Sequence, residues 1–419
     1  LKDSTRALHD QIEASPFAKA FLHKELPLQS YAGYLRFMAS LHGCVECMLA
    51  HSDEARVKAV WSQNYSRLPA LLEDFLWLRP KLIPDSNGLI RAMLASLSHI
   101  RLVAQEDPMG LLGCVYVLWG STKGAVTLAP LARKTHALEQ GKGLSYLTQH
   151  ATSGAAQWEA LAPALDQALD SETAFQSSEK AAVALFKHIQ EAFEQLFPVD
   201  TNDLTYHVLA LNPYGGSHEM PQDPKAITAL QRASDRCLAE FPYFISRFGL
   251  RGYLFSDSDG AWLATLPGEG EATMMRNVQW LRGVLSSRGI PGYLLQRHLE
   301  FLIKELERAE AAPPEHLALL STCVQDMEGQ WQTTLPQGER ERLLTQFEEA
   351  SSVTAIAREA GVLALSAVVD EAHGIQGAVQ GLMEYYGDGR IFSEPFKKAV
   401  LDLIDASRQV VGTTSSQDS

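Results

Sequence analysis

Apolar residues recur at intervals of three and four along almost the whole chain, which is the spacing that places them on one face of an α-helix. The alternation of apolar and polar residues that is typical of strands is nearly absent. The pattern therefore predicts an all-α protein. Its clearest helices are expected at 31–48, 89–102, 181–197, 274–285 and 294–306.

One long stretch interrupts this helical pattern, "FPVDTNDLTYHVLALNPYGGSHEMPQDP" at 197–224, which is rich in Pro, Gly, Asn and Asp. A chain of 419 residues is also longer than one hydrophobic core usually organises. We therefore expect two domains. The predicted parts are a first domain at 1–198, a linker at 199–224, a helical domain at 225–411 and a flexible polar tail at 412–419.

The second half of the chain is predicted to be as helical as the first. Its apolar positions indicate helices near 225–248, 271–287, 291–309, 316–333 and 394–410. The segment "RGYLFSDSDGAWLATL" at 251–266 contains Ser, Asp and Gly in a cluster typical of turns. We expect this segment to be a connection between helices.

Composition narrows the classes of partner. The formal net charge of −14 argues against broad binding of nucleic acid or of an anionic membrane, because both need a basic surface. The five cysteines have no regular spacing and do not predict a disulfide framework. No apolar stretch reaches the length of a membrane-spanning helix, and no basic and apolar leader is present, so we expect a cytoplasmic protein of undetermined oligomeric state.

The first fifteen residues, "LKDSTRALHDQIEAS", place unusual chemistry on one helix face. Lys2, Arg6, His9 and Glu13 are spaced by four, three and four residues, so they form one stripe. Imidazole is an axial ligand of heme iron, and a carboxylate one turn away can orient it. The spacing alone leaves open the simpler interpretation, a solvated helix face with unrelated charges.

A second unusual stretch is "LGCVYVLWGSTKGAVTLAP" at 112–130. Gly120 and Gly124 lie four residues apart in a helical pattern, where each glycine costs about 0.5–1 kcal/mol relative to alanine. One reason for such a cost is close approach of the backbone to a flat ligand, with a kink of the helix at that point. Tight packing between helices is the alternative, and the segment alone does not choose.

Together the two stretches resemble the heme oxygenase family. The first helix of that family carries a pattern close to L-K-x-x-T-x-x-L/V-H-x-x-x-E, matched here by Leu1, Lys2, Thr5, His9 and Glu13. Its distal helix carries G-[DS]-x-x-G-[GA], which Gly120, Ser121, Gly124 and Ala125 match, and "LFKHIQEAFEQL" at 185–196 is similar to its last core helix. The resemblance spans about 1–198.

The resemblance implies a heme-oxygenase-like helical bundle followed by a second helical domain of unknown role. It implies that His9 is the proximal iron ligand, that Glu13 supports it through water, and that Lys2 and Arg6 face the heme propionates. Gly120, Ser121 and Gly124 would line the distal face. The reaction implied is oxidation of heme by O2 to biliverdin, CO and ferrous iron, with electrons from a separate reductase or ferredoxin.

Two other functions stay open. Many family members have Asp at the position of Ser121, and Lys123 stands where a small or apolar residue is usual, so a non-catalytic heme or bilin sensor or trafficking protein is the main alternative. A third possibility is another enzyme on a similar fold, either a thiamin-degrading hydrolase using Cys44 or Cys114 or a di-iron oxidase. We expect those two cysteines to be buried thiols.

Overall fold

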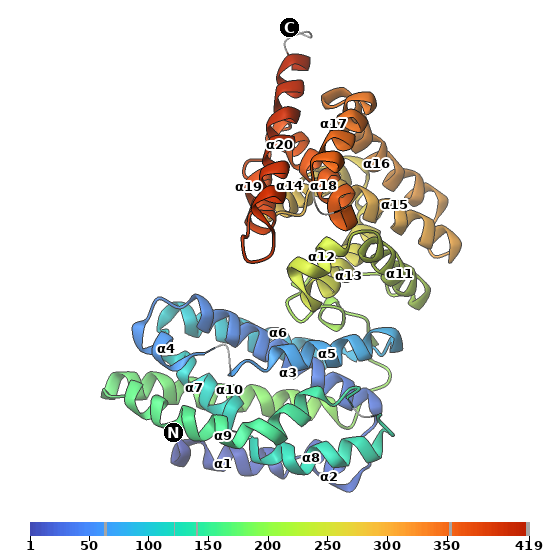
Figure 1. Ribbon diagram of the computed structural model, residues 1–419. Helices are drawn as coiled ribbons and strands as arrows, with labels where there is room; N and C mark the ends of the chain where they lie inside the picture. The colour runs from blue at the N-terminus through green and yellow to red at the C-terminus, as the bar shows by residue number, and fades with distance from the viewer. Residues whose placement is uncertain (63–64, 121, 140, 352–353, 416–419) are drawn as a thin grey trace. The chain divides into compact units, whose positions relative to one another are not determined.

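The computed structural model describes residues 1–62, 65–120, 122–139, 141–351 and 354–415. Within these ranges almost every element is a helix, as the sequence predicts (Figure 1). The described chain divides into two compact units, Leu1–His218 and Glu219–Ser419, and each is described by itself.

The first unit contains ten α-helices among the described residues, two short 3-10 helices and two strands of two residues. They are α1 (Lys2–Glu13), α2 (Pro16–His23), α3 (Leu28–His51), α4 (Ala55–Val60), α5 (Leu68–Leu78), η2 (Arg79–Lys81), β1 (Asp85–Ser86), α6 (Asn87–Glu106), α7 (Gly110–Gly120), α8 (Thr122–Thr135), α9 (Ser145–Ala168), α10 (Glu172–Leu196), β2 (Leu204–Thr205) and η3 (Val208–Ala210).

Side chains at the helix starts explain several of these boundaries. Ser15, Ser86 and Ser171 each accept a hydrogen bond from the backbone N–H three residues later, at α2, α6 and α10. Such a cap satisfies one of the amide groups that the first turn leaves unpaired. Pro16 occupies the first position of α2, where its missing N–H costs nothing.

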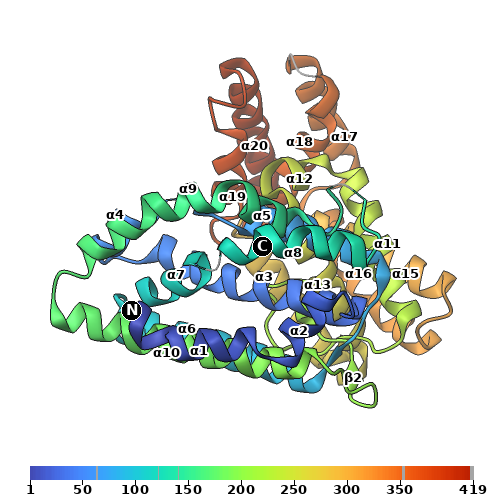
Figure 2. The ribbon, with the colours of Figure 1, turned by 90° about the horizontal axis from the view of Figure 1, so that it is seen from below.

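Helix α10 organises the first unit, because α1, α6 and α7 all pack against it (Figures 1 and 2). The closest approach is at Gly113 of α7, where an added Cβ would lie 2.0 Å from the backbone oxygen of Ser178. The Ser178 hydroxyl also donates a hydrogen bond of 2.7 Å to the oxygen of Met109. The glycine therefore lets two backbones touch, which fixes α7 on α10.

A buried ion pair joins α3 to the start of the two-stranded ladder. Nη1 of Arg36 lies 2.9 Å from Oδ2 of Asp85, and both side chains are 3% exposed. The same nitrogen donates to the oxygen of Ile83 at 2.7 Å. Because removal of either partner would leave a buried charge uncompensated, the pair ties β1 and the start of α6 to α3.

The segment after α10 folds back onto the first unit. Strand β2 pairs antiparallel with β1, with Thr205 opposite Asp85. The hydroxyl of Tyr206 donates to the oxygen of Leu82 at 3.0 Å, and Val208 and Leu209 are buried. Much of the stretch predicted as a linker at 199–224 thus packs against the first unit. The domain bounds expected from the sequence, 1–198 and 225–411, stay a prediction.

The second unit contains ten α-helices among the described residues and one 3-10 helix. They are α11 (Pro224–Glu240), α12 (Pro242–Phe248), α13 (Leu250–Thr265), η4 (Leu266–Glu269), α14 (Glu271–Ser286), α15 (Gly292–Arg308), α16 (Pro314–Thr334), α17 (Gln337–Ala350), α18 (Thr354–Ala372), α19 (Ala378–Tyr386) and α20 (Glu394–Ser415). Helix α20 includes the first part of the predicted tail, and 416–419 lie outside the described residues.

Two expectations for this unit are wrong. The segment 251–266 is not a connection, because α13 runs through it with Asp257 and Ser258 buried. The predicted helix at 225–248 is two helices, because Pro242 begins α12 and cannot continue the hydrogen-bonding of α11.

Asp370 of α18 joins α14 and α15 within this unit. It accepts hydrogen bonds from Nε of Arg282 at 2.8 Å and from the N–H of Gly292 at 2.7 Å.

No single helix in the described part of the chain is both long and apolar enough to cross a membrane. Helix α7 and residues 124–135 of α8 meet that test only when they are taken together as a bent pair. The side chains of α7 are mostly buried within the first unit, as in the core helix of a folded domain.

The packing at Gly113 predicts a large effect of a small substitution. Gly113→Ala should destabilise the first unit by about 3 kcal/mol or more, because the new methyl group would overlap a backbone oxygen that cannot move alone. Gly124→Ala is the matched control, since nothing lies within 4 Å of its added Cβ, and it should be neutral or stabilising. Urea unfolding of the two variants measures the difference, and equal midpoints would contradict this account of the packing.

Candidate functional site

Helix α1 presents the four predicted ligand residues on its exposed surface. Lys2, Arg6, His9 and Glu13 are all exposed. Nδ1 of His9 lies 3.7 Å from Oε1 of Glu13, and the side chains are 51% and 70% exposed. A carboxylate at this position orients the imidazole and leaves Nε2 as the nitrogen turned away from it.

Helix α10 supports the imidazole from behind. The ring of Phe186 meets the ring of His9 edge to face, with centroids 6.2 Å apart. Oxygen and nitrogen atoms of His9, Asp10 and Glu13 also lie within 4.8 Å of one another, as metal ligands can, although such exposed groups often hold no ion. The imidazole therefore has a carboxylate near one nitrogen and an aromatic ring against one side.

Lys2 and Arg6 precede His9 on α1 by about two turns and one turn. Among the residues that the structure describes, neither side chain forms an ion pair. Two exposed cations therefore precede His9 and Glu13 on one stripe of α1. Each could donate to an anionic group of a ligand held at His9.

Helices α1 and α7 meet at one polar contact. The hydroxyl oxygens of Thr5 and Tyr116 are 3.5 Å apart. Farther along both helices, α2 packs against α8 (Figure 2), so the two pairs run in the same direction. His9 follows Thr5 by four residues on α1, and Gly120 follows Tyr116 by four residues on α7. Both residues therefore lie about one helical turn beyond this contact. His9 is thus on the same side of the contact as the C-terminal end of α7.

The two predicted distal glycines differ in their surroundings. Gly124 is exposed and an added Cβ would have nothing within 4 Å, so the backbone there is open to a ligand. An added Cβ at Gly120 would instead lie 3.5 Å from the indole of Trp158, which reaches over from α9. Trp158 also packs edge to face on Tyr116. Ser121, the third predicted distal residue, lies outside the described residues.

These residues fit a heme group in the chemistry of their donors. The site offers an imidazole with a nearby carboxylate, two cations without an ion pair among the described residues, and a glycine whose face is open. An imidazole can bind heme iron, cations can bind the propionates, and an open glycine leaves room for a flat macrocycle. Helices α1 and α7, both held by α10, position the two sides.

Sequence reasoning missed a buried polar network behind α7. Nδ1 of His42 lies 3.2 Å from Oε1 of Glu46, and Nε2 lies 3.4 Å from the hydroxyl of Tyr146. The imidazole is fully buried and packs against Trp119, the residue before Gly120. Burial lowers the pKa of His42, an effect that the hydrogen bond to Glu46 opposes. The ring therefore links α3, α7 and α9.

Arg67 completes this network. Its backbone N–H donates to Oε1 of Glu46 at 2.9 Å, and the Ser66 hydroxyl donates to the other carboxylate oxygen. The guanidinium is fully buried, and among the described residues Nε and Nη2 have no hydrogen-bond partner while Nη1 donates to the Ser153 hydroxyl at 3.3 Å. Burial lowers the pKa of Arg67. A buried cation so poorly satisfied is costly, so neighbouring packing must compensate for it.

The two cysteines considered as nucleophiles are buried, as expected. Burial raises the pKa of Cys44 to about 11 and that of Cys114 to about 12. A thiol must lose its proton to act as a nucleophile. Neither side chain is therefore suited to the hydrolase alternative.

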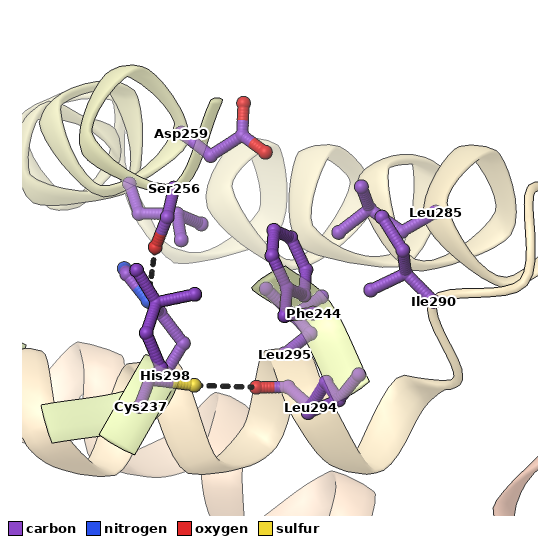
Figure 3. A pocket seen from close by; sticks show the side chains of 11 residues that line it. Cys237, Phe244, Ser256, Asp259, Leu285, Ile290, Leu294, Leu295 and His298 are labelled. Carbon is purple, nitrogen blue, oxygen red and sulfur yellow. Dashed lines mark hydrogen bonds between the residues drawn. The ribbon is translucent and has the colours of Figure 1, made fainter. Parts of the chain in front are cut away.

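The second unit has a small enclosed cavity of about 40 Å³ (Figure 3). Nδ1 of His298 faces the Ser256 hydroxyl at 3.4 Å, and the carboxylate of Asp259 points away from that pair. Nε2 of His298 has no partner among the described residues, and burial lowers the pKa of this ring to about 4. The volume suits a water molecule and is too small for a substrate.

The comparisons with known proteins concern the first unit. The heme oxygenase family model matches residues 1–195. No curated protein matches the chain. Among solved structures, heme oxygenase-1 of the cyanobacterium Synechocystis sp. PCC6803 in complex with heme is 18% identical, with 47% of this chain and 90% of that chain covered and a TM-score of 0.42. Heme oxygenase of Leptospira interrogans is 22% identical, with 46% and 97% covered and a TM-score of 0.41.

Neither the family model nor these two structures assigns the C-terminal part of the chain. The sequence-based family assignment is confirmed for the first part. Residues 1–195 belong to the heme oxygenase family.

Proposed function

We propose that the first unit binds heme and cleaves it to biliverdin, CO and ferrous iron, using O2 and electrons from a separate reductase or ferredoxin. The observation that carries the proposal is the His9–Glu13 pair on the exposed face of α1, in a segment that matches the heme oxygenase family. Bound heme supplies the iron at which O2 is activated. The remaining tasks fall to side chains and backbone of this chain.

His9 binds the iron through Nε2 in this proposal, since Nδ1 is turned to Glu13. The Glu13 carboxylate would help to orient the ring. Phe186 limits rotation of the ring from the α10 side. The pair would therefore offer the heme iron one oriented nitrogen ligand.

Lys2 and Arg6 bind the propionates, because they are the two cations of the stripe and have no carboxylate partner among the described residues. On the other side, the bare backbone at Gly124 would let α8 lie close to the macrocycle, with Gly120 on the same distal face. Ser121, the third residue proposed for that face, lies outside the described residues.

A non-catalytic heme- or bilin-binding role is the second candidate. It is favoured by Trp158, whose indole lies where a Cβ of Gly120 would point. An aromatic ring against the first distal glycine could restrict the space that O2 needs. The two functions make different predictions for turnover.

The first prediction concerns the axial ligand. His9→Ala should abolish the Soret spectrum of the heme complex with an imidazole ligand, and added free imidazole should restore it, because the variant removes only the iron-binding group. His51→Ala, at the end of α3, is the control and should keep the wild-type spectrum. Heme titration followed by absorption measures both. An unchanged spectrum in His9→Ala would remove His9 from the site.

The second prediction concerns the propionates. The double variant Lys2→Gln/Arg6→Gln should bind heme about tenfold more weakly at low salt, and the difference should shrink as salt increases because exposed charges are screened. Lys19→Gln/Lys225→Gln removes the same charge from exposed positions elsewhere and should have little effect. Equal losses in the two double variants would show a dependence on net charge only.

The third prediction separates the enzyme from the binding protein. With heme, O2 and a chemical or enzymatic reductant, the wild-type chain should lose its Soret band within one turnover and gain the absorbance of biliverdin, with CO released. The His51→Ala variant should convert heme as the wild-type chain does, and the His9→Ala variant should form no biliverdin. A Soret band that persists under reductant and O2 with no bilin formed would establish the non-catalytic role.

A further inference from the structure

The second unit contains a much larger pocket than the one in Figure 3. It has a volume of about 730 Å³ and lies among the C-terminal end of α11, the start of α15, and helices α16, α17 and α18. Pockets that bind small molecules in proteins typically have volumes of about 300–1,000 Å³. The pocket is therefore large enough for an organic ligand.

One wall of the pocket is aromatic. Phe241 meets Tyr293 with ring centroids 5.9 Å apart, and Tyr293 meets Trp331 at 5.5 Å, both nearly edge to face. These rings come from the end of α11, from α15 and from α16. Leu344 of α17 adds an aliphatic surface and is itself buried. Such a wall favours a flat apolar ligand body.

Most carboxylates that line the pocket already have partners. Glu240 accepts hydrogen bonds of 2.8 and 2.9 Å from Arg297. Glu341 accepts two from Nη2 of Arg358, at 2.9 and 3.2 Å. These two carboxylates are already hydrogen-bonded to arginines of the protein, so they do not require a cationic ligand.

The donors of the pocket are less well satisfied. Arg340 lies over the ring of Trp331 at 5.0 Å, its Nε is buried without a hydrogen-bond partner, and its Nη2 is 3.5 Å from Oε1 of Glu328. That glutamate is shared with Gln332, which donates to it at 2.7 Å. Within the described residues, neither the hydroxyl of Tyr293 nor Nε1 of Trp331 forms a hydrogen bond.

A buried donor without an acceptor is costly, so the buried Nε of Arg340 is a group to which a ligand can supply an acceptor. We propose that this pocket binds a small ligand with a flat conjugated body and a carboxylate. The body lies against Phe241, Tyr293 and Trp331, and the carboxylate accepts hydrogen bonds from Arg340. The chemistry fits both a simple aromatic carboxylate and a linear tetrapyrrole with its propionates.

The test uses the full heme-free chain and two probes, indole-3-propionate and biliverdin, with binding measured by isothermal titration calorimetry. Arg340→Gln should weaken binding of at least one probe by tenfold or more, because it removes the charge and the Nε donor. Arg358→Gln is the matched control, since that guanidinium is already paired with Glu341 and Glu348, and it should change binding by less than threefold.

Tyr293→Phe guards against misfolding of the arginine variant, because it removes only a hydroxyl group from the wall. It should weaken binding of the same probe severalfold and leave thermal unfolding unchanged. If Arg340→Gln weakens the binding of indole-3-propionate and biliverdin does not bind this pocket, the ligand is a small aromatic carboxylate. If Arg340→Gln weakens the binding of biliverdin, the ligand is a tetrapyrrole. Biliverdin held in the first unit would be insensitive to Arg340→Gln.

Three outcomes overturn the proposal: no binding of either probe at millimolar concentration, equal losses in the two arginine variants, or equally tight binding of the cationic analogue tryptamine. None of these outcomes bears on His9, because the heme spectrum of the first unit is measured separately. Conversely, loss of the heme function leaves the binding of indole-3-propionate to the second unit intact.

Discussion

The backbone contact between α7 and α10 at Gly113 is the constraint on which the candidate site depends. Helix α10 carries α1 on one part of its surface and α7 on another, so His9 and the glycines near the end of α7 are placed relative to each other through α10. A side chain at Gly113 would separate the backbones of α7 and α10, and the break after Gly120 would move with α7. Local sequence supplies the candidate ligand residues, and helix packing determines how they lie relative to one another.

The sequence was sufficient for the features that depend on neighbours in the chain. Helical periodicity predicts α3, α6 and α15, and spacing alone puts His9 and Glu13 on one face. It fails at 251–266, because Asp257 and Ser258 favour turns in isolation but are buried in a helix by contacts with distant elements. Local propensity is a weak guide where tertiary packing determines the backbone.

The buried network around His42 could not be predicted for a similar reason. His42 and Glu46 are spaced by four, a signal visible in the sequence, but Tyr146 and Arg67 join them from other helices. Their burial is costly, and what it provides is a set of directed contacts that hold α3, α7 and α9 in one arrangement. Because Trp119 packs on His42 directly before Gly120, this rigidity acts on the end of α7, where the distal side of the candidate heme site begins.

Charge links the two proposed ligand sites. The chain carries 50 acidic and 36 basic residues, so a cation without a carboxylate partner is conspicuous. Lys2 and Arg6 on α1 are such cations among the described residues, whereas Arg340 over Trp331 has one partner, Glu328, and a buried Nε that is left without one. An acidic protein repels anionic ligands at long range, so binding of an anion at either proposed site would depend on short-range contacts with these cations. A flat apolar body would add contacts with the aromatic wall or with the open backbone, and these contacts would offset the general repulsion.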